Sequence, residues 1–73
     1  MRNSIILHDL QTTDPILVYI DKIDVIRTHN VVSQMSGALY RKRDYVTVLV
    51  NGAVIQVEES FEKIQELIEE AEL

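Results

Sequence analysis

The sequence predicts a small α+β fold, in which a mainly antiparallel sheet of about five strands is followed by one C-terminal amphipathic helix (βββββα). Short runs rich in β-branched residues, separated by turn residues, fill residues 1–57. Over residues 61–72 the hydrophobic period changes from about two to about 3.6, which is typical of a helix. The connections between the runs are too short for parallel crossovers, so neighbouring strands are expected to be antiparallel.

Length and composition indicate one small domain. The chain has 73 residues and no Cys, so we expect a single domain, residues 1–73, without disulfides or thiolate metal sites. A chain this short buries a smaller share of its surface than a larger domain does, and its stability is expected to be marginal. Oligomerisation is then the remaining common source of additional burial.

The first two strands are predicted from apolar runs on either side of a turn. Residues 4–10 form the first strand, because their centre is apolar and β-branched. Residues 11–15 form a turn, since Pro15 fixes its own φ and disfavours the helical region for Asp14. Residues 16–20 form the second strand, which is too short for a helix.

The third strand is predicted over residues 24–32, after a short break at Asp21 and Lys22. Val25 and Ile26 are expected to be its core contacts. Residues 33–38 form the next break, and Gly37 is expected at its tip because glycine adopts a positive φ without steric cost.

Residues 45–50 and 53–57 are predicted to form a hairpin of the fourth and fifth strands. Asn51 and Gly52 lie between these two apolar runs. This dipeptide suits both central positions of a type I′ turn, which is the preferred turn of a two-residue hairpin.

The predicted helix begins after Ser60, whose hydroxyl can accept from backbone N–H groups of the first turn. Helical spacing places one apolar stripe along it, made of Phe61, Ile64, Leu67, Ile68 and Ala71. Phe61, Ile64 and Leu67 are expected to contact the core.

Charge is unevenly distributed along the chain. Residues 58–73 carry a net charge of -6 and residues 1–57 a net charge of +1, within a total of -5. The acidic helix is either a solvated face or a surface for a basic partner. The low pI disfavours general nucleic-acid binding, because phosphate contacts need a positive local potential.

One basic stretch stands out against this background. It lies in the sequence SGALYRKRDYVT, residues 36–47, and its candidate binding residues are Tyr40, Arg41, Lys42, Arg43 and Tyr45, together with His29. If the third and fourth strands continue beyond the sheet, residues 29–45 form a hairpin arm that exposes apolar side chains to a subunit or a ligand. The alternative is a flexible loop whose basic residues keep a strand edge soluble.

The residues offer little support for catalysis. Gly37 and Gly52 are the only glycines, and both have turn explanations, so no Gly-rich phosphate loop is predicted. His8 and His29 are predicted on strands, where a histidine is more often a surface or packing residue than a catalytic base. We therefore expect a protein that is not an enzyme and uses no cofactor.

Metal binding and membrane insertion are not expected. Asp21 and Asp24 flank a turn, and two carboxylates without further oxygen ligands are a weak calcium or magnesium signal. The longest apolar run, residues 15–20, is far too short to span a membrane. No targeting segment is visible at the N-terminus, so we expect a cytoplasmic protein.

Several motifs together resemble a known family. They are Pro15-Ile16-Leu17-Val18, Ile20-Asp21-Lys22-Ile23, Val46-Thr47-Val48-Leu49-Val50-Asn51-Gly52 and Val57-Glu58-Glu59-Ser60. In this order they resemble the small flagellar and swarming-motility protein family (FlbD-like) and related short bacterial and phage proteins. The resemblance implies a motility-type accessory role and no catalytic residues. Residues 30–44 form a longer segment than the family pattern has, so they are the candidate carrier of what is particular to this protein.

The leading functional prediction is a small, non-catalytic, homo-oligomeric interaction module, a dimer or larger, of the motility-accessory type. The alternative is a phage-encoded protein that sequesters an anionic ligand such as a nucleotide. If the protein is phage-encoded, we expect it in the host cytoplasm. RNA binding is a third hypothesis, which the acidic helix disfavours. The expected partners are further copies of the chain and an unknown protein or anionic small molecule, without a membrane.

Overall fold

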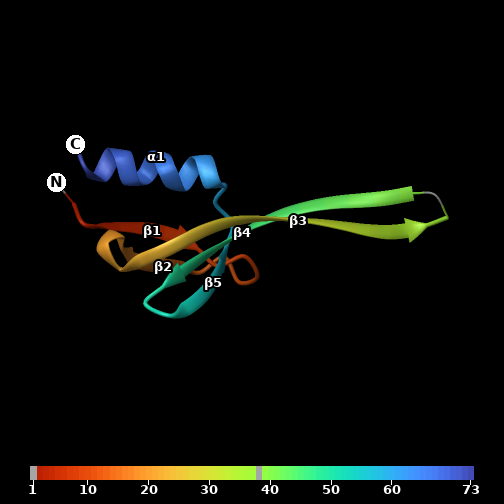
Figure 1. Ribbon diagram of the computed structural model, residues 1–73, viewed down its shortest axis with the longest axis horizontal. Coiled ribbons are helices and arrows are strands. Elements are labelled where there is room, and N and C mark those ends of the chain that lie inside the picture. Colours follow the sequence, from red (N-terminus) through yellow and green to blue (C-terminus); the bar gives the residue numbers. More distant parts are fainter. Residues whose placement is uncertain (1, 38) are drawn as a thin grey trace.

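The computed structural model describes residues 2–37 and 39–73, apart from the side chains of residues 33–36 and 39–43. It has a body with one helix along its side and a long two-stranded ribbon that projects from this body (Figure 1). The molecule is correspondingly elongated, with dimensions of 51 × 23 × 21 Å.

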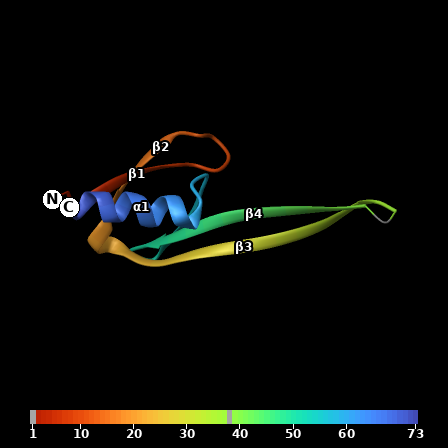
Figure 2. The same ribbon diagram turned by 90° about the horizontal axis from the view of Figure 1, so that it is seen from above.

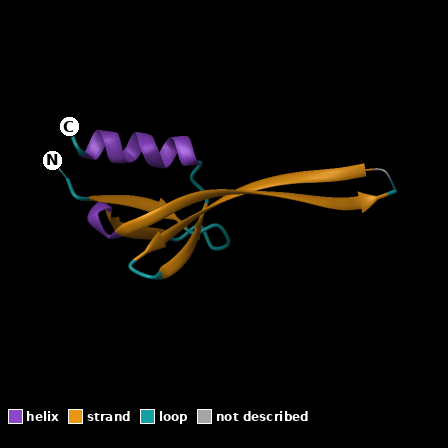
Figure 3. Ribbon diagram, viewed as in Figure 1, coloured by secondary structure: helices purple, strands orange, loops and turns teal. Residues whose placement is uncertain are grey.

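The order of the elements confirms the predicted α+β class (Figure 3). The elements are β1 (Ser4–His8), β2 (Pro15–Tyr19), the 3-10 turn η1 (Ile20–Lys22), β3 (Ile23–Ser36), β4 (Leu39–Val50), β5 (Ala53–Val57) and α1 (Phe61–Ala71). β3 and β4 are much longer than the predicted strands 24–32 and 45–50, because they continue as a pair through the segment that the sequence left open as arm or loop.

The strands are all antiparallel and form two sheets, β1-β2 and β3-β4-β5. The sheets are joined where β1 ends, through the bridge between Asp9 and Val57. On either side of it, Leu10 N–H donates to the Gln56 carbonyl at 3.0 Å and Glu58 N–H donates to the His8 carbonyl at 2.9 Å. This short junction brings the inner faces of both sheets to one core.

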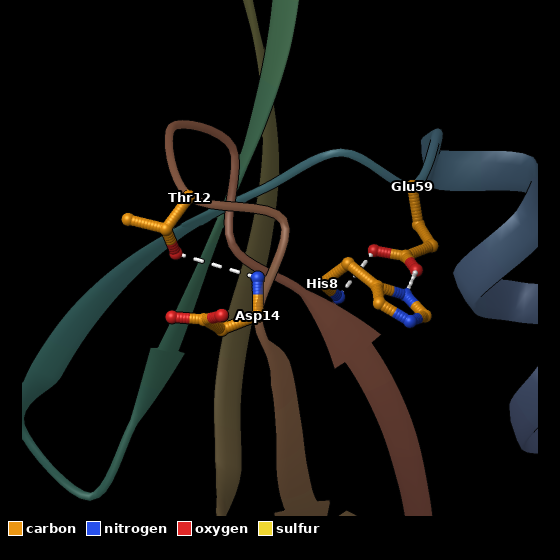
Figure 4. A network of polar contacts seen from close by, with 4 residues as sticks. All are labelled: His8, Thr12, Asp14 and Glu59. Atoms are coloured by element: carbon orange, nitrogen blue, oxygen red, sulfur yellow. Dashed lines mark hydrogen bonds and ion pairs between the residues drawn. The ribbon is translucent and has the colours of Figure 1, made fainter.

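The first strand ends at His8 and not at Leu10 as predicted, because Asp9 starts the turn. Its carboxylate accepts from the backbone N–H groups of Gln11 at 2.8 Å and Thr12 at 3.0 Å. These two hydrogen bonds hold the pKa of Asp9 below its ordinary value, and the bond from Thr12 has the larger effect. Asp14 N–H then donates to the Thr12 hydroxyl at 3.3 Å (Figure 4).

The predicted turn and cap residues adopt the expected geometry. Asn51 has a φ of 50° and Gly52 a φ of 87°, as a type I′ turn requires. Gly37 has a φ of 55° in the turn between β3 and β4. The Ser60 hydroxyl accepts from Lys63 N–H at 3.1 Å and caps α1.

The core lies between α1 and the inner faces of the two sheets. Its buried side chains are Ile5, Leu7, Val18, Val46, Val48, Val57, Ile64 and Ala71. They come from alternate positions of the strands and from one stripe of the helix, as their periodicity requires. Leu67 and Ile68 pack against this cluster from the helix.

Two predicted core contacts are wrong. Val25 is 44% exposed, because a register shift between Ile23 and Val25 pairs it with Leu49, on the outer face of the sheet. Ile26, its predicted companion, does pack against the core. Phe61 is 41% exposed, because it is the first residue of α1 and lies one turn before the first fully buried helix residue, Ile64.

Candidate functional site

The outer part of the ribbon projects beyond the body (Figure 2). β3 and β4 pair from Ile23–Val50 to Ser36–Leu39, whereas β5 pairs only with residues 46–50 of β4. Among the described strands, none pairs with the far edge of β3 or with β4 before Val46. We call residues 29–45 the arm and the other described residues, 2–28 and 46–73, the body. Both backbone edges of the arm are therefore open for further pairing.

Apolar side chains of the arm are exposed on both of its faces. Val31 is 39% exposed and Val32 is 58% exposed. As neighbours in a strand they point to opposite faces, so neither face of the arm is purely polar. A two-stranded ribbon has little stability of its own in water. The arm therefore has the features of an element that gains stability from a partner.

His29 and Tyr45 lie at the root of the arm and face each other across β3 and β4. Their rings are stacked, with 4.8 Å between the centroids and 12° between the planes. His29 Nε2 also lies 2.9 Å from the Thr47 hydroxyl, at hydrogen-bond distance. These contacts hold both rings in a defined orientation on the outer face of the sheet.

The outer face of β3-β4-β5 is hollowed next to this ring pair. The hollow has a volume of about 380 Å³ and is lined by Val25, Arg27, His29, Tyr45, Thr47, Leu49, Val54 and Gln56. None of these lining residues is acidic, and Arg27 forms no ion pair with any described residue. The hollow therefore combines apolar side chains, an aromatic pair and a guanidinium that has no ion pair with the described part of the chain. We call it the outer hollow.

The structure brings together only part of the predicted site. His29 and Tyr45 are in contact, as described above. The backbone of residues 40–43 lies in β4, but the side chains of Tyr40, Arg41, Lys42 and Arg43 lie outside the described residues. Whether they join His29 and Tyr45 therefore stays a prediction.

The sequence reasoning missed Arg27, Thr47 and Gln56 as site residues. A signal was available for two of them, because Arg27 precedes His29 by two positions and Thr47 follows Tyr45 by two. Residues two apart in a strand share a face. Gln56 joins them only through the register, in which it is the cross-strand partner of Thr47.

His8 and Glu59 form a polar contact between the end of β1 and the segment before α1 (Figure 4). Glu59 Oε1 accepts from His8 N–H at 2.9 Å, and Oε2 lies 2.6 Å from His8 Nδ1. Partial burial raises the pKa of Glu59, but the hydrogen bonds from the His8 ring and backbone outweigh it and hold the pKa below its ordinary value. The pair ties the end of β1 to the segment that starts α1.

The described residues contain no cluster of three or more His, Asp, Glu or Cys side chains that could hold a metal ion. Nor does any described helix combine the length and the apolar character that a bilayer crossing needs.

Comparisons with protein-family models, with curated proteins and with solved structures find no match for this chain. The resemblance to the motility family therefore stays a prediction from the motifs.

Proposed function

We propose that the protein is a non-catalytic interaction module that self-associates through its arm. The single observation that supports this most strongly is the exposure of Val31 and Val32 on an arm with two open edges. Natural proteins usually cover or disrupt long open strand edges, because such edges pair readily with other chains. A second copy of this chain supplies a strand of matching length.

Charge favours a second copy as the occupant. Residues 29–45 carry Arg41, Lys42, Arg43 and Asp44, which is net positive, whereas residues 58–73 carry a net charge of -6. Within one copy the arm extends away from α1 (Figure 2). When the arms of two copies pair antiparallel, the basic residues of each arm approach the body of the other copy and therefore its acidic helix. Charge complementarity of this kind favours association.

The surface of the molecule is large enough for a stable dimer. A standard interface buries about 800 Å² on each partner. The accessible surface of one copy is 5491 Å², so such an interface covers roughly 15% of it. The additional burial also offsets the small size of the core. A motility-type accessory role is compatible with such a module and rests on the motif resemblance alone.

The test is the solution mass of the wild type and of two matched variants, measured by light scattering and sedimentation. Each copy weighs 8.4 kDa. The wild type is expected to have a mass of at least two copies at micromolar concentration, and the Val31→Ser/Val32→Ser variant the mass of one. Leu17→Ser is the control, because Leu17 is 58% exposed, like Val32, but lies in β2 of the body.

A wild type that stays monomeric up to about millimolar concentration contradicts the proposal, since specific interfaces of this size bind more tightly. So does a Leu17→Ser variant that dissociates while the Val31→Ser/Val32→Ser variant does not. Circular dichroism of each variant checks that the body remains folded.

A further inference from the structure

We propose that the outer hollow binds a planar aromatic anion of the nucleoside monophosphate class. The ring lies against the His29–Tyr45 pair, and the anionic group meets Arg27. All the lining residues belong to one copy of the chain, so the inference does not depend on self-association.

The lining residues form three rows across the strands. The rows are Val25-Leu49-Val54, Arg27-Thr47-Gln56 and His29-Tyr45. Successive rows on one face are about 7 Å apart, and neighbouring strands are about 4.8 Å apart. The three rows thus cover roughly 10 by 14 Å, which is the size of a nucleoside monophosphate. The volume of about 380 Å³ also lies in the range of small-ligand sites.

Each row offers a different interaction. His29 and Tyr45 use one face of each ring for their mutual stacking, so a base can stack on an outer face of the pair. Arg27 presents a planar fork of N–H donors that matches two phosphate oxygens. Gln56 carries both a donor and an acceptor for the polar edge of a base. The row of Val25, Leu49 and Val54 supplies apolar contact for the remaining ring or sugar atoms.

The negative net charge of the chain does not oppose an anion at this face. The acidic side chains of residues 58–73 lie mainly in α1. Ile64 and Ala71 of α1 belong to one buried core cluster with Val46, Val48 and Val57, which lie on the inner face of the same sheet. The sheet thus separates the acidic helix from the outer hollow, and salt screens interactions beyond about 8 Å at physiological ionic strength.

Arg27 also distinguishes this ligand from an apolar segment of a partner protein. An apolar segment that covers the hollow removes the guanidinium from water without a counter-charge, which is costly. An aromatic anion supplies both the ring and the counter-charge.

The experiment is an NMR titration of ¹⁵N-labelled protein with adenosine 5′-monophosphate. Changes in amide chemical shift are expected mainly at the residues that line the outer hollow. Adenosine alone and inorganic phosphate alone are each expected to bind at least about tenfold more weakly, because each loses one of the two contacts. A short oligouridylate is titrated in parallel, because a single-stranded nucleic acid carries the same base and phosphate groups. Tighter binding of the oligonucleotide assigns the site to a single strand. Tighter binding of the monophosphate assigns it to a free nucleotide.

Two variants with matched controls test the assigned residues. Arg27→Gln is expected to weaken adenosine monophosphate binding about tenfold or more, whereas Arg2→Gln, an exposed arginine outside the hollow, leaves it unchanged. Tyr45→Leu is expected to weaken binding by a similar factor, and Tyr19→Leu, on the exposed face of β2, is its control. The amide spectrum of each variant shows whether its fold is retained.

Three outcomes overturn the inference. The first is that millimolar adenosine monophosphate causes no change in the amide chemical shifts of the residues that line the outer hollow. The second is a folded Arg27→Gln variant that binds as tightly as the wild type. The third is a change in the amide signals of Val25, Leu49, Val54 and Gln56 when the free protein is diluted. These residues line the hollow outside the arm, so such a change means that a second copy covers this face.

Discussion

β3 and β4 run through two regions with opposite surroundings, the body and the arm. In the body their inner face is closed by α1 and β1-β2, and Val46 and Val48 are 5% and 0% exposed. In the arm the same two strands have no such cover among the described residues, and Val32 is 58% exposed. Apolar residues occur in both regions, so strand character does not require local burial. The buried side chains that stabilise the fold therefore lie in the body, whereas Val31 and Val32 of the arm contribute little burial.

The largest difference between the regions is expected for truncation of one buried and one exposed aliphatic side chain. Ile64→Ala removes a fully buried side chain of the body and is expected to lower the free energy of unfolding by about 3 kcal/mol. Val32→Ala in the arm is expected to lower it by about 0.5 kcal/mol or less, measured at a concentration where the protein is monomeric.

Urea denaturation followed by circular dichroism measures both changes. If Ile64→Ala costs less than about 1 kcal/mol, α1 does not support the core as its burial indicates. If Val32→Ala costs as much as Ile64→Ala in the monomer, the arm and the body are one cooperative region and the comparison fails.

Phe61 marks the border of the body, and its truncation is expected to have an intermediate effect. Its side chain is 41% exposed, so Phe61→Ala is expected to cost about 2 kcal/mol, below the range of about 3–5 kcal/mol for a fully buried Phe. The same denaturation experiment measures it, with Glu66→Ala on the exposed side of α1 as control. A cost well above 3 kcal/mol restores Phe61 to the core, where the sequence pattern had predicted it.

The smallest expected effect is that of the His8–Glu59 contact, which joins β1 to the start of α1. Glu59→Gln is expected to cost about 1 kcal/mol at neutral pH, because it removes the charge but retains one acceptor. Glu66→Gln, an exposed carboxylate of α1, is the control.

The pH dependence identifies the source of this stabilisation. The pKa of Glu59 is lower in the folded protein than in the unfolded chain, so its contribution is complete above the ordinary pKa of Glu, about 4.3. It is lost as the pH falls through the lowered pKa of the folded state. In denaturation curves recorded at decreasing pH, Glu59→Gln is therefore expected to lose less stability than the wild type. Parallel losses in the two proteins contradict this assignment.

The sequence by itself determined the features that depend on neighbouring residues. The order of the elements follows from the change in hydrophobic period. The turn at Asn51 and Gly52 and the cap at Ser60 follow from backbone geometry and from one side-chain hydroxyl. These are local preferences, and they need no knowledge of what lies across the sheet.

The tertiary structure decided which residues share a face and which surfaces are covered. The shift between Ile23 and Val25 moved Val25 from the core to the outer hollow, although the apolar pattern suited either face. The same register places Arg27 opposite Thr47, and β5 then places Gln56 beside them. The physical reason is that a shift of one residue in pairing reverses the faces of a strand, and register depends on contacts between distant parts of the chain.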